Sequence, residues 1–277
     1  MFLKRNILTR AAVSVILIVA TYFVGGSPAH AEESRHRSSH TQTIRIDDRG
    51  IAMPDLVKGP AIDLMVRNVG VFVHELAITE VRPGTTVSQI IQAQADGVRE
   101  PSSWVGDPGG INLLGSGEQV RYQRLLHPGT YVFFVPRPDS HPQLERAAYH
   151  LFRVVDFGYR DLRNPELTIA LGDDAITLPE IDEGLHSYAI TNIGTSPHEV
   201  FIIGTSRAAD LDKVDAVAAW LEGGQVGPPP VPLHFPGGHQ TIEPGETIIF
   251  TLTLRSGWTY GFGDGTTDPP HMAKSTA

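Results

Sequence analysis

The pattern of apolar and polar residues predicts a chain built mainly of β-strands. Segments 44–68 and 168–192 each contain an alternating strand, a short apolar strand with a proline, and a second alternating strand. Residues 131–135 and 247–251 are β-branched and aromatic runs between turn residues. The chain also contains 28 glycines and 21 prolines, which favour many turns. An all-β fold is therefore expected.

Two short segments depart from this pattern and carry apolar residues at the spacing of an amphipathic helix. They are Val87–Ala95 and Leu211–Trp220. Each stands at the same place relative to the predicted strands around it. One short helix is therefore expected in each half of the chain.

The sequence repeats itself at a nearly constant offset. An Asn-x-Gly motif followed by His-Glu begins at Asn68 and again at Asn192, 124 residues later. Five further landmarks recur in the same order: the two helical segments, Gly109-Gly110 with Gly237-Gly238, Gly117-Glu118 with Gly245-Glu246, Tyr131 with Tyr260, and His141 with His271. The chain is therefore expected to contain two copies of one domain.

The N-terminus has the composition of an export signal. Lys4, Arg5 and Arg10 provide positive charge, an apolar stretch follows at 11–25, and Ala29-His30-Ala31 fits a cleavage site. An uncleaved membrane anchor is the alternative. The predicted organisation is a signal peptide at 1–31, a mobile polar segment at 32–40, the first domain at 41–156, a linker at 157–165 and the second domain at 166–277.

Charge and export narrow the choice of partners. Cleavage of the signal would remove three positive charges and change the net charge from −9 to −12. An acidic surface repels phosphate backbones and anionic lipids. A secreted or periplasmic protein is therefore expected, without nucleic acid as a partner and without membrane attachment after cleavage. Its partner is expected to be a protein or a small ligand.

The chain contains no cysteine. Disulfides, thiolate metal ligands and a cysteine nucleophile are therefore excluded. The sequence also lacks a Gly-x-Ser-x-Gly nucleophile motif and a glycine-rich phosphate loop followed by lysine. No catalytic residue is predicted.

The repeated motifs resemble those of cupredoxin-like domains in exported bacterial proteins. The resemblance rests on the Asn-x-Gly, His-Glu, Gly-Gly, Gly-Glu, Gly-x-Tyr and late histidine motifs, and it covers nearly all of the predicted mature chain. It implies two tandem Greek-key β-sandwiches, each with one short helix. It also implies a metal or ligand site at one end of each sandwich.

The same resemblance implies that a blue-copper centre is absent. The cysteine of such a centre would fall at Val135 in the first copy and at about Gly263 in the second. Electron transfer by a copper–thiolate site is therefore not expected. A copper or zinc site made of imidazoles remains open, and its candidate ligands are His74, His141, His150, His198 and His271. The alternative is that these histidines have ordinary structural roles.

The glutamates that follow the early histidines are expected to lie outside any such site. Adjacent residues of a strand face opposite sides, so Glu75 and Glu199 should not share the site of His74 and His198. They are expected to be solvent-facing or bonded to a loop.

The second domain is predicted to be shorter than the first at its C-terminal end. After His141 the first copy continues into an apolar strand at 150–156, whereas only six residues follow His271. The closing strand of the second domain is therefore expected to be missing. Its place could be filled by strand exchange or by a dimer partner.

These features of the sequence are compatible with three alternative functions. The favoured one is a noncatalytic binding protein with a copper or zinc site. The others are a metal-free interaction module that uses the edge of the second domain or the groove between the domains, and a two-domain copper oxidoreductase.

Overall fold

The computed structural model of the protein describes residues 41–95, 104–135, 148–159, 161–266 and 271–276. The predicted signal peptide and the polar segment at 32–40 lie outside the described residues. Thr41–Ala277 forms one unit. No helix in the described part of the chain has the length and hydrophobicity needed to cross a membrane.

The same order of elements occurs twice along the chain, which is mainly β-strand as predicted. The N-terminal half contains β1 (Gln42–Ile46), β2 (Ile51–Ala52), β3 (Leu56–Asn68), β4 (His74–Val81), α1 (Val87–Ala95), β5 (Val105–Leu114), β6 (Gln119–Leu125), β7 (Gly129–Val135) and β8 (Ala148–Tyr159). The C-terminal half contains β9 (Leu167–Leu171), β10 (Ile176–Thr177), β11 (Gly184–Asn192), β12 (His198–Thr205), α2 (Val214–Glu222), β13 (Leu233–Ile242), β14 (Thr247–Leu254), β15 (Thr259–Asp264) and β16 (His271–Thr276). The expected division into two separate domains stays a prediction.

The second helix begins later than the sequence predicts. Ala208–Lys213 forms a 3₁₀ helix, and α2 follows it directly. The carboxylate of Asp210 accepts hydrogen bonds from Arg207 and Lys213. These bonds favour the tighter turn before the α-helix begins.

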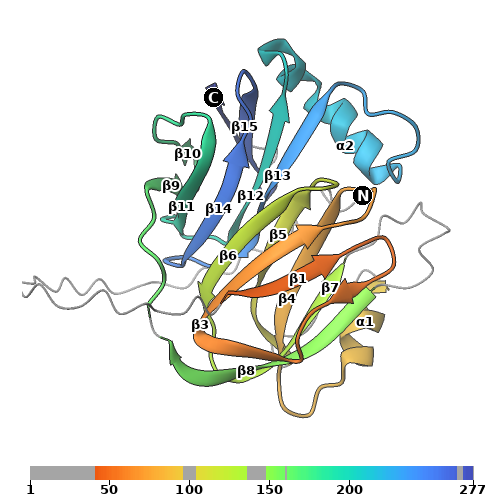
Figure 1. The fold of residues 1–277 in the computed structure, drawn as a ribbon, viewed down its shortest axis with the longest axis vertical. Helices are drawn as coiled ribbons and strands as arrows, with labels where there is room; N and C mark the ends of the chain where they lie inside the picture. The colour runs from red at the N-terminus through yellow and green to blue at the C-terminus, as the bar shows by residue number, and fades with distance from the viewer. Residues whose placement is uncertain (1–40, 96–103, 136–147, 160, 267–270, 277) are drawn as a thin grey trace, which may run out of the picture. The chain divides into compact units, whose positions relative to one another are not determined.

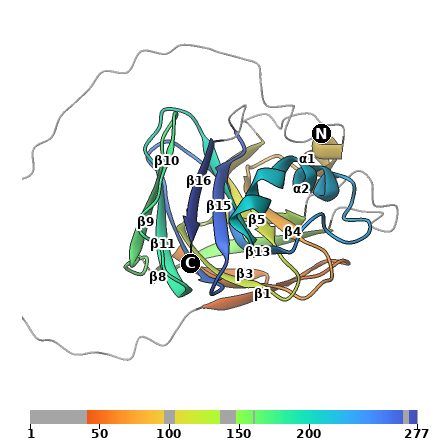
Figure 2. The same cartoon turned by 90° about the horizontal axis from the view of Figure 1, so that it is seen from above.

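Most strands lie in one continuous path, whose order is β10-β9-β11-β14-β6-β3-β8-β7-β4-β5-β13-β12-β15-β16, and β1 pairs with β3 and β2 off this path. The long strand β3 joins the two layers, because Leu56–Pro60 pairs with β8 and Ala61–Arg67 pairs with β6. The two ends of the path, β10 and β16, contact each other (Figure 2). The strands therefore enclose a core between two layers, as in a β-sandwich.

The expectation that the closing strand of the second copy is missing is wrong. β16 pairs antiparallel with β15 from Thr259↔Thr276 to Asp264↔His271. The expectation placed His271 before any closing strand, whereas the strand begins at His271 itself. The six residues from His271 to Thr276 are therefore sufficient to form it. Unlike β8, which pairs with both β7 and β3, β16 pairs with one strand.

The two halves meet through both layers at a seam, which consists of the strand pairs β5–β13 and β6–β14 (Figure 1). At this seam Ile111 pairs with His239, and Tyr122 pairs with Phe250. Each pair joins residues that are 128 positions apart, so residues of the two copies that correspond in sequence face each other. The seam therefore has an approximate local two-fold symmetry, like an isologous dimer contact.

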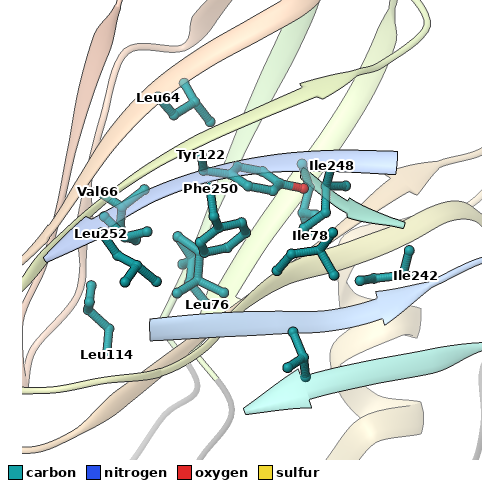
Figure 3. Packing of buried hydrophobic residues seen from close by; sticks show 14 of the residues in the cluster. Leu64, Val66, Leu76, Ile78, Leu114, Tyr122, Ile242, Ile248, Phe250 and Leu252 are labelled. Carbon is teal, nitrogen blue, oxygen red and sulfur yellow. The ribbon is translucent and has the colours of Figure 1, made fainter. Parts of the chain in front are cut away.

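One hydrophobic cluster extends across the seam. It includes Leu64, Leu76 and Ile78 from the N-terminal half, and Ile248 and Leu252 from the C-terminal half (Figure 3). Tyr122 and Phe250 lie within it with their ring centroids 5.6 Å apart. The alternating apolar residues of the strands therefore pack into a core that both halves share.

A second hydrophobic cluster lies where α2 covers β12 and β13 (Figure 1). Val217 of α2 packs with Phe201 and Ile203 of β12 and with Phe235 of β13. The apolar face predicted from helical spacing therefore serves to bind α2 to the sheet. This packing positions the end of α2 beside the seam.

Candidate functional site

A groove of about 360 Å³ lies at the seam and is walled by both halves of the chain. The N-terminal half contributes residues 71–73 and the turn at 115–118. The C-terminal half contributes the segment from Trp220 to Phe235, together with Arg255. Apolar side chains and glycines line the groove together with five polar or charged residues, Ser116, Glu118, Gln225, His234 and Arg255. A groove of this volume can hold a small molecule.

Hydrogen bonds between the two halves hold the groove walls together. The side chain of Gln225 accepts a hydrogen bond from the Val73 N–H (2.7 Å) and donates one to the Val73 carbonyl (2.9 Å). The Gly115 N–H donates to the Phe235 carbonyl (2.8 Å). The Gln225 amide thus takes the place of a neighbouring strand for Val73. The walls are therefore fixed without a ligand.

A chain of polar groups forms one side of the groove. The Tyr260 hydroxyl accepts a hydrogen bond from the Arg255 N–H (2.7 Å) and lies 2.8 Å from Nδ1 of His234. Nε2 of His234 lies 3.2 Å from Oε1 of Glu118, which also contacts Nη2 of Arg255 at 2.5 Å. The Tyr260 hydroxyl can donate its proton to Nδ1 of His234. In that tautomer the imidazole carries its own proton on Nε2, which faces Glu118.

The charge of Glu118 is set by its neighbours. Burial tends to raise its pKa, but hydrogen bonds and charge from His234 and Arg255 outweigh burial, and the pKa lies below its usual value. Glu118 is therefore ionised. The Arg255 guanidinium also lies 5.5 Å from the centre of the Trp258 ring, a cation–π contact that helps to fix its position.

The corresponding glutamate on the other side of the seam, Glu246, is 18% exposed and pairs with a buried cation. Glu246 contacts Nε of Arg124 at 2.6 Å, and the Arg124 side chain is only 4% exposed. Arg124 also donates to the Pro108 carbonyl (2.9 Å). Position 106, which corresponds to His234, is glycine. A buried ion pair therefore occupies this side.

His239 lies between these two sides in the shared core. It is fully buried, its ring centre is 5.5 Å from that of Tyr122, and its Nδ1 contacts the Gln240 carbonyl. Burial, together with the positive charge of Arg124, lowers the pKa of His239 to about 3. His239 is therefore neutral at physiological pH.

The structure assigns His74 a local partner. His74 begins β4, is 5% exposed, and its Nε2 lies 2.9 Å from Oδ1 of Asp48. Asp48 also accepts hydrogen bonds from the Val71 and Phe72 N–H groups. Burial raises the pKa of Asp48, but these bonds outweigh it and the pKa lies below its usual value.

His198 is enclosed by two carboxylates. Its Nδ1 lies 2.6 Å from Oδ2 of Asp264, which is buried, and its Nε2 lies 3.2 Å from Oδ1 of Asp173. The backbone of His271 pairs with Asp264 across β15 and β16. The structure therefore brings His198, Asp264 and the start of β16 to one place.

The position that corresponds to Val135 in the second copy is Asp264, not Gly263 as the sequence alignment suggested. Ala77 pairs with Phe134 and Phe201 with Gly263, so the next residues, Val135 and Asp264, correspond. A one-residue offset along a strand exchanges its two faces. The expected place of the missing cysteine in the C-terminal half therefore moves from about Gly263 to Asp264, whose carboxylate can bind a metal.

His150, the other candidate ligand of the N-terminal half within the described residues, does not join His74. His150 lies on β8 opposite Phe133, and its Nε2 contacts Asp55 at 3.0 Å. Phe133 also pairs with Ile78, four residues along β4 from His74, which corresponds to roughly 13 Å of strand. His141 lies outside the described residues. Within the part of the chain that the structure describes, no three His, Asp or Glu side chains form a group that could hold a metal ion.

Glu75 and Glu199 are partly buried near the seam. From the sequence they are expected to face solvent or to bond to a loop. Gln240 of β13 donates a hydrogen bond of 3.4 Å to Glu75. Burial raises the pKa of Glu75 to about 7. Burial, together with the charges of Glu75 and Asp264, raises that of Glu199 to about 8. These contacts are compatible with the expectation that Glu75 and Glu199 face away from His74 and His198.

Sequence reasoning identified Glu118 and Glu246 as repeat landmarks but not as partners of cations across the seam. Asp48 and Asp173, which contact His74 and His198, could have been found from the sequence, because an Asp-Asp pair follows the first strand of each copy. For Gln225 and Arg255 no local motif exists, since their partners Val73 and Glu118 belong to the other half of the chain.

Among solved structures, multicopper oxidases and blue copper proteins resemble this chain. A multicopper oxidase is 14% identical with a TM-score of 0.27 and covers 85% of this chain and 88% of its own. Auracyanin from Roseiflexus castenholzii is 18% identical with a TM-score of 0.28 and covers 42% and 98%. Copper nitrite reductase from Nitrosomonas europaea is 9% identical with a TM-score of 0.22 and covers 85% and 92%.

These TM-scores are too low to assign the chain to any of these families. No family model matches the sequence, and no curated protein sequence matches it significantly.

Proposed function

We propose that the protein is a noncatalytic binding protein whose ligand occupies the groove at the seam. The observation that carries this proposal is a preformed groove of about 360 Å³, walled by both halves and lined by apolar residues with a few polar groups. The Gln225–Val73 hydrogen bonds hold the walls in place before a ligand arrives. Preorganisation of this kind reduces the entropic cost of binding.

The experiment is a fluorescence titration with N-phenyl-1-naphthylamine, a neutral apolar probe. The wild-type protein should bind one probe per chain with a saturable increase in emission. Trp220→Ala, which removes an apolar wall of the groove, should weaken binding at least tenfold, which corresponds to about 1.4 kcal/mol.

The matched control is Leu185→Ala, which removes an exposed side chain on β11 that does not line the groove. It should bind like the wild type. Equal loss in both variants, or a signal that never saturates, would contradict binding in the groove.

A second candidate function is copper or zinc binding in the C-terminal half. It is favoured by the convergence of His198, Asp264 and the backbone of His271. Imidazole and carboxylate groups are ligands that both metals accept. Such a site would use His198 and Asp264, with His271 as the third predicted ligand.

Elemental analysis after copper and zinc loading tests this candidate. One metal per chain should be retained by the wild type and by His74→Ala, and lost in Asp264→Val, which copies the residue of the N-terminal half. Retention of the metal by Asp264→Val would exclude this site. We also propose that the protein itself is exported, as a secreted or periplasmic protein, on the basis of the predicted signal peptide.

A further inference from the structure

The groove has a charged side whose exposed member is a cation. Arg255 and Glu118 are the Arg and Glu residues that line it. The Arg255 side chain is 47% exposed, whereas that of Glu118 is 20% exposed and that of His234 is 1% exposed. Arg255 is therefore the charged group that a ligand in the groove meets first.

Arg255 keeps hydrogen-bonding capacity in its present position. A guanidinium has five N–H donors in a planar fork. One contact to Glu118, through Nη2, is part of the polar chain. The guanidinium carbon of Arg255 lies 5.5 Å from the centre of the Trp258 ring, a cation–π contact that restrains the side chain. The planar fork of a guanidinium matches the geometry of a carboxylate.

The apolar lining of the groove favours an apolar ligand body. Phe72, Trp220 and Leu233 line it and are each only partly buried, and Val71 is 74% exposed. Covering these side chains would remove apolar surface from water. The groove therefore combines partly exposed apolar side chains with an exposed cation.

Glu118 does not cancel this preference. Its Oε1 lies close to both Arg255 and His234, so its charge is balanced within the groove wall. A second anion at Arg255 would compete with Glu118 for the guanidinium. Removal of the Glu118 charge should therefore strengthen anion binding.

We infer that the groove binds an amphipathic organic carboxylate, with its alkyl or aryl body against Phe72 and Trp220 and its carboxylate on Arg255. This inference rests on the proposed function, because it specifies the ligand of the same groove. A straight-chain carboxylate of about eight carbons is small enough for a groove of about 360 Å³.

Isothermal titration of the purified protein with octanoate, octanamide and octylammonium tests the inference, because these probes share an apolar body and differ in charge. Octanoate should bind at least tenfold more tightly than octanamide. Arg255→Gln should bring the two within about twofold. Glu118→Gln should bind octanoate more tightly than the wild type does, while octanamide changes little.

If circular dichroism shows that Arg255→Gln is unfolded, Glu118→Gln still tests the inference, since it leaves the Arg255 cation in place. Octanamide or octylammonium binding as tightly as octanoate would overturn the carboxylate inference while groove binding stands. The inference is also overturned when octanoate fails to bind although the neutral probe binds. Failure of the neutral probe as well would overturn the proposed function itself.

Discussion

The two sides of the seam start from corresponding residues and differ in what fills the space between the halves. Glu246 meets Arg124, a cation that is 4% exposed, and that side is enclosed. Glu118 meets Arg255, a cation that is 47% exposed, and that side is the groove. The difference shows how a duplicated chain can keep one symmetric contact and still create a single asymmetric site.

Single substitutions account for this asymmetry. His234 stands where the first copy has Gly106, and Leu252 stands where the first copy has Arg124. Arg124 fills its side from within β6, whereas Arg255 approaches from the end of β14. The strand framework is therefore shared, and the side chains at the seam decide which side is open.

The largest expected effect is the loss of the enclosed ion pair. Arg124→Leu, which copies Leu252, leaves the Glu246 carboxylate without its cation and should lower the free energy of unfolding by about 3–5 kcal/mol. Chemical denaturation measures this change. Arg124→Leu combined with Glu246→Gln removes the unpaired charge and should recover much of the loss. A loss below about 1 kcal/mol in the single variant would show that the pair does not hold the seam.

A smaller effect is expected from the two glutamates near the seam. Because their folded-state pKa values are raised to about 7 and about 8, their stabilising contribution is complete below about pH 4.5 and is lost as pH rises through 7 to 8. Between pH 5 and 8 the protein should lose about 3 kcal/mol of stability on this account, allowing for their partial exposure. Glu75→Gln with Glu199→Gln should flatten this slope in denaturation curves. An unchanged slope would contradict the raised pKa values.

The smallest of the three effects has the opposite sign. Because burial lowers the pKa of His239 to about 3, its contribution is complete above about pH 6.5 and is lost as pH falls. Between pH 6.5 and 5 this amounts to about 2 kcal/mol. His239→Ile, which copies Ile111 on the other side of the strand pair, should remove this acid sensitivity. An equally steep acid loss in the variant would assign it to other groups.

The strands and the repeat could be predicted from the sequence because their signals are local. Residues 87–95 form the predicted helix, and the alternating segments form strands, since the periodicity of a short window fixes which face is buried. The closing strand was missed because the expectation began it after His271. The counterpart of Val135 was missed by one residue, which in a strand exchanges the inner and outer faces.

The site could not be predicted, because it depends on pairing between the halves. Ile111 and His239 are 128 residues apart, and no local pattern shows that β5 and β13 become neighbours. Glu118 was visible as a repeat landmark, yet its contacts with His234 and Arg255 arise only at the seam. Of the histidines chosen as ligands, His198 contacts the Asp264 side chain and His271 pairs with the backbone of Asp264, whereas His150 lies about four strand residues from His74.

The central claim is that the open side of the seam is a binding site, and a blocked groove tests it most directly. Val71 lines the groove and is 74% exposed, so Val71→Trp should fill the mouth without disturbing the fold. Titration of N-phenyl-1-naphthylamine into the wild type should give one saturable site per chain, and the variant should bind at least tenfold more weakly. Equal binding by the two proteins would contradict the claim.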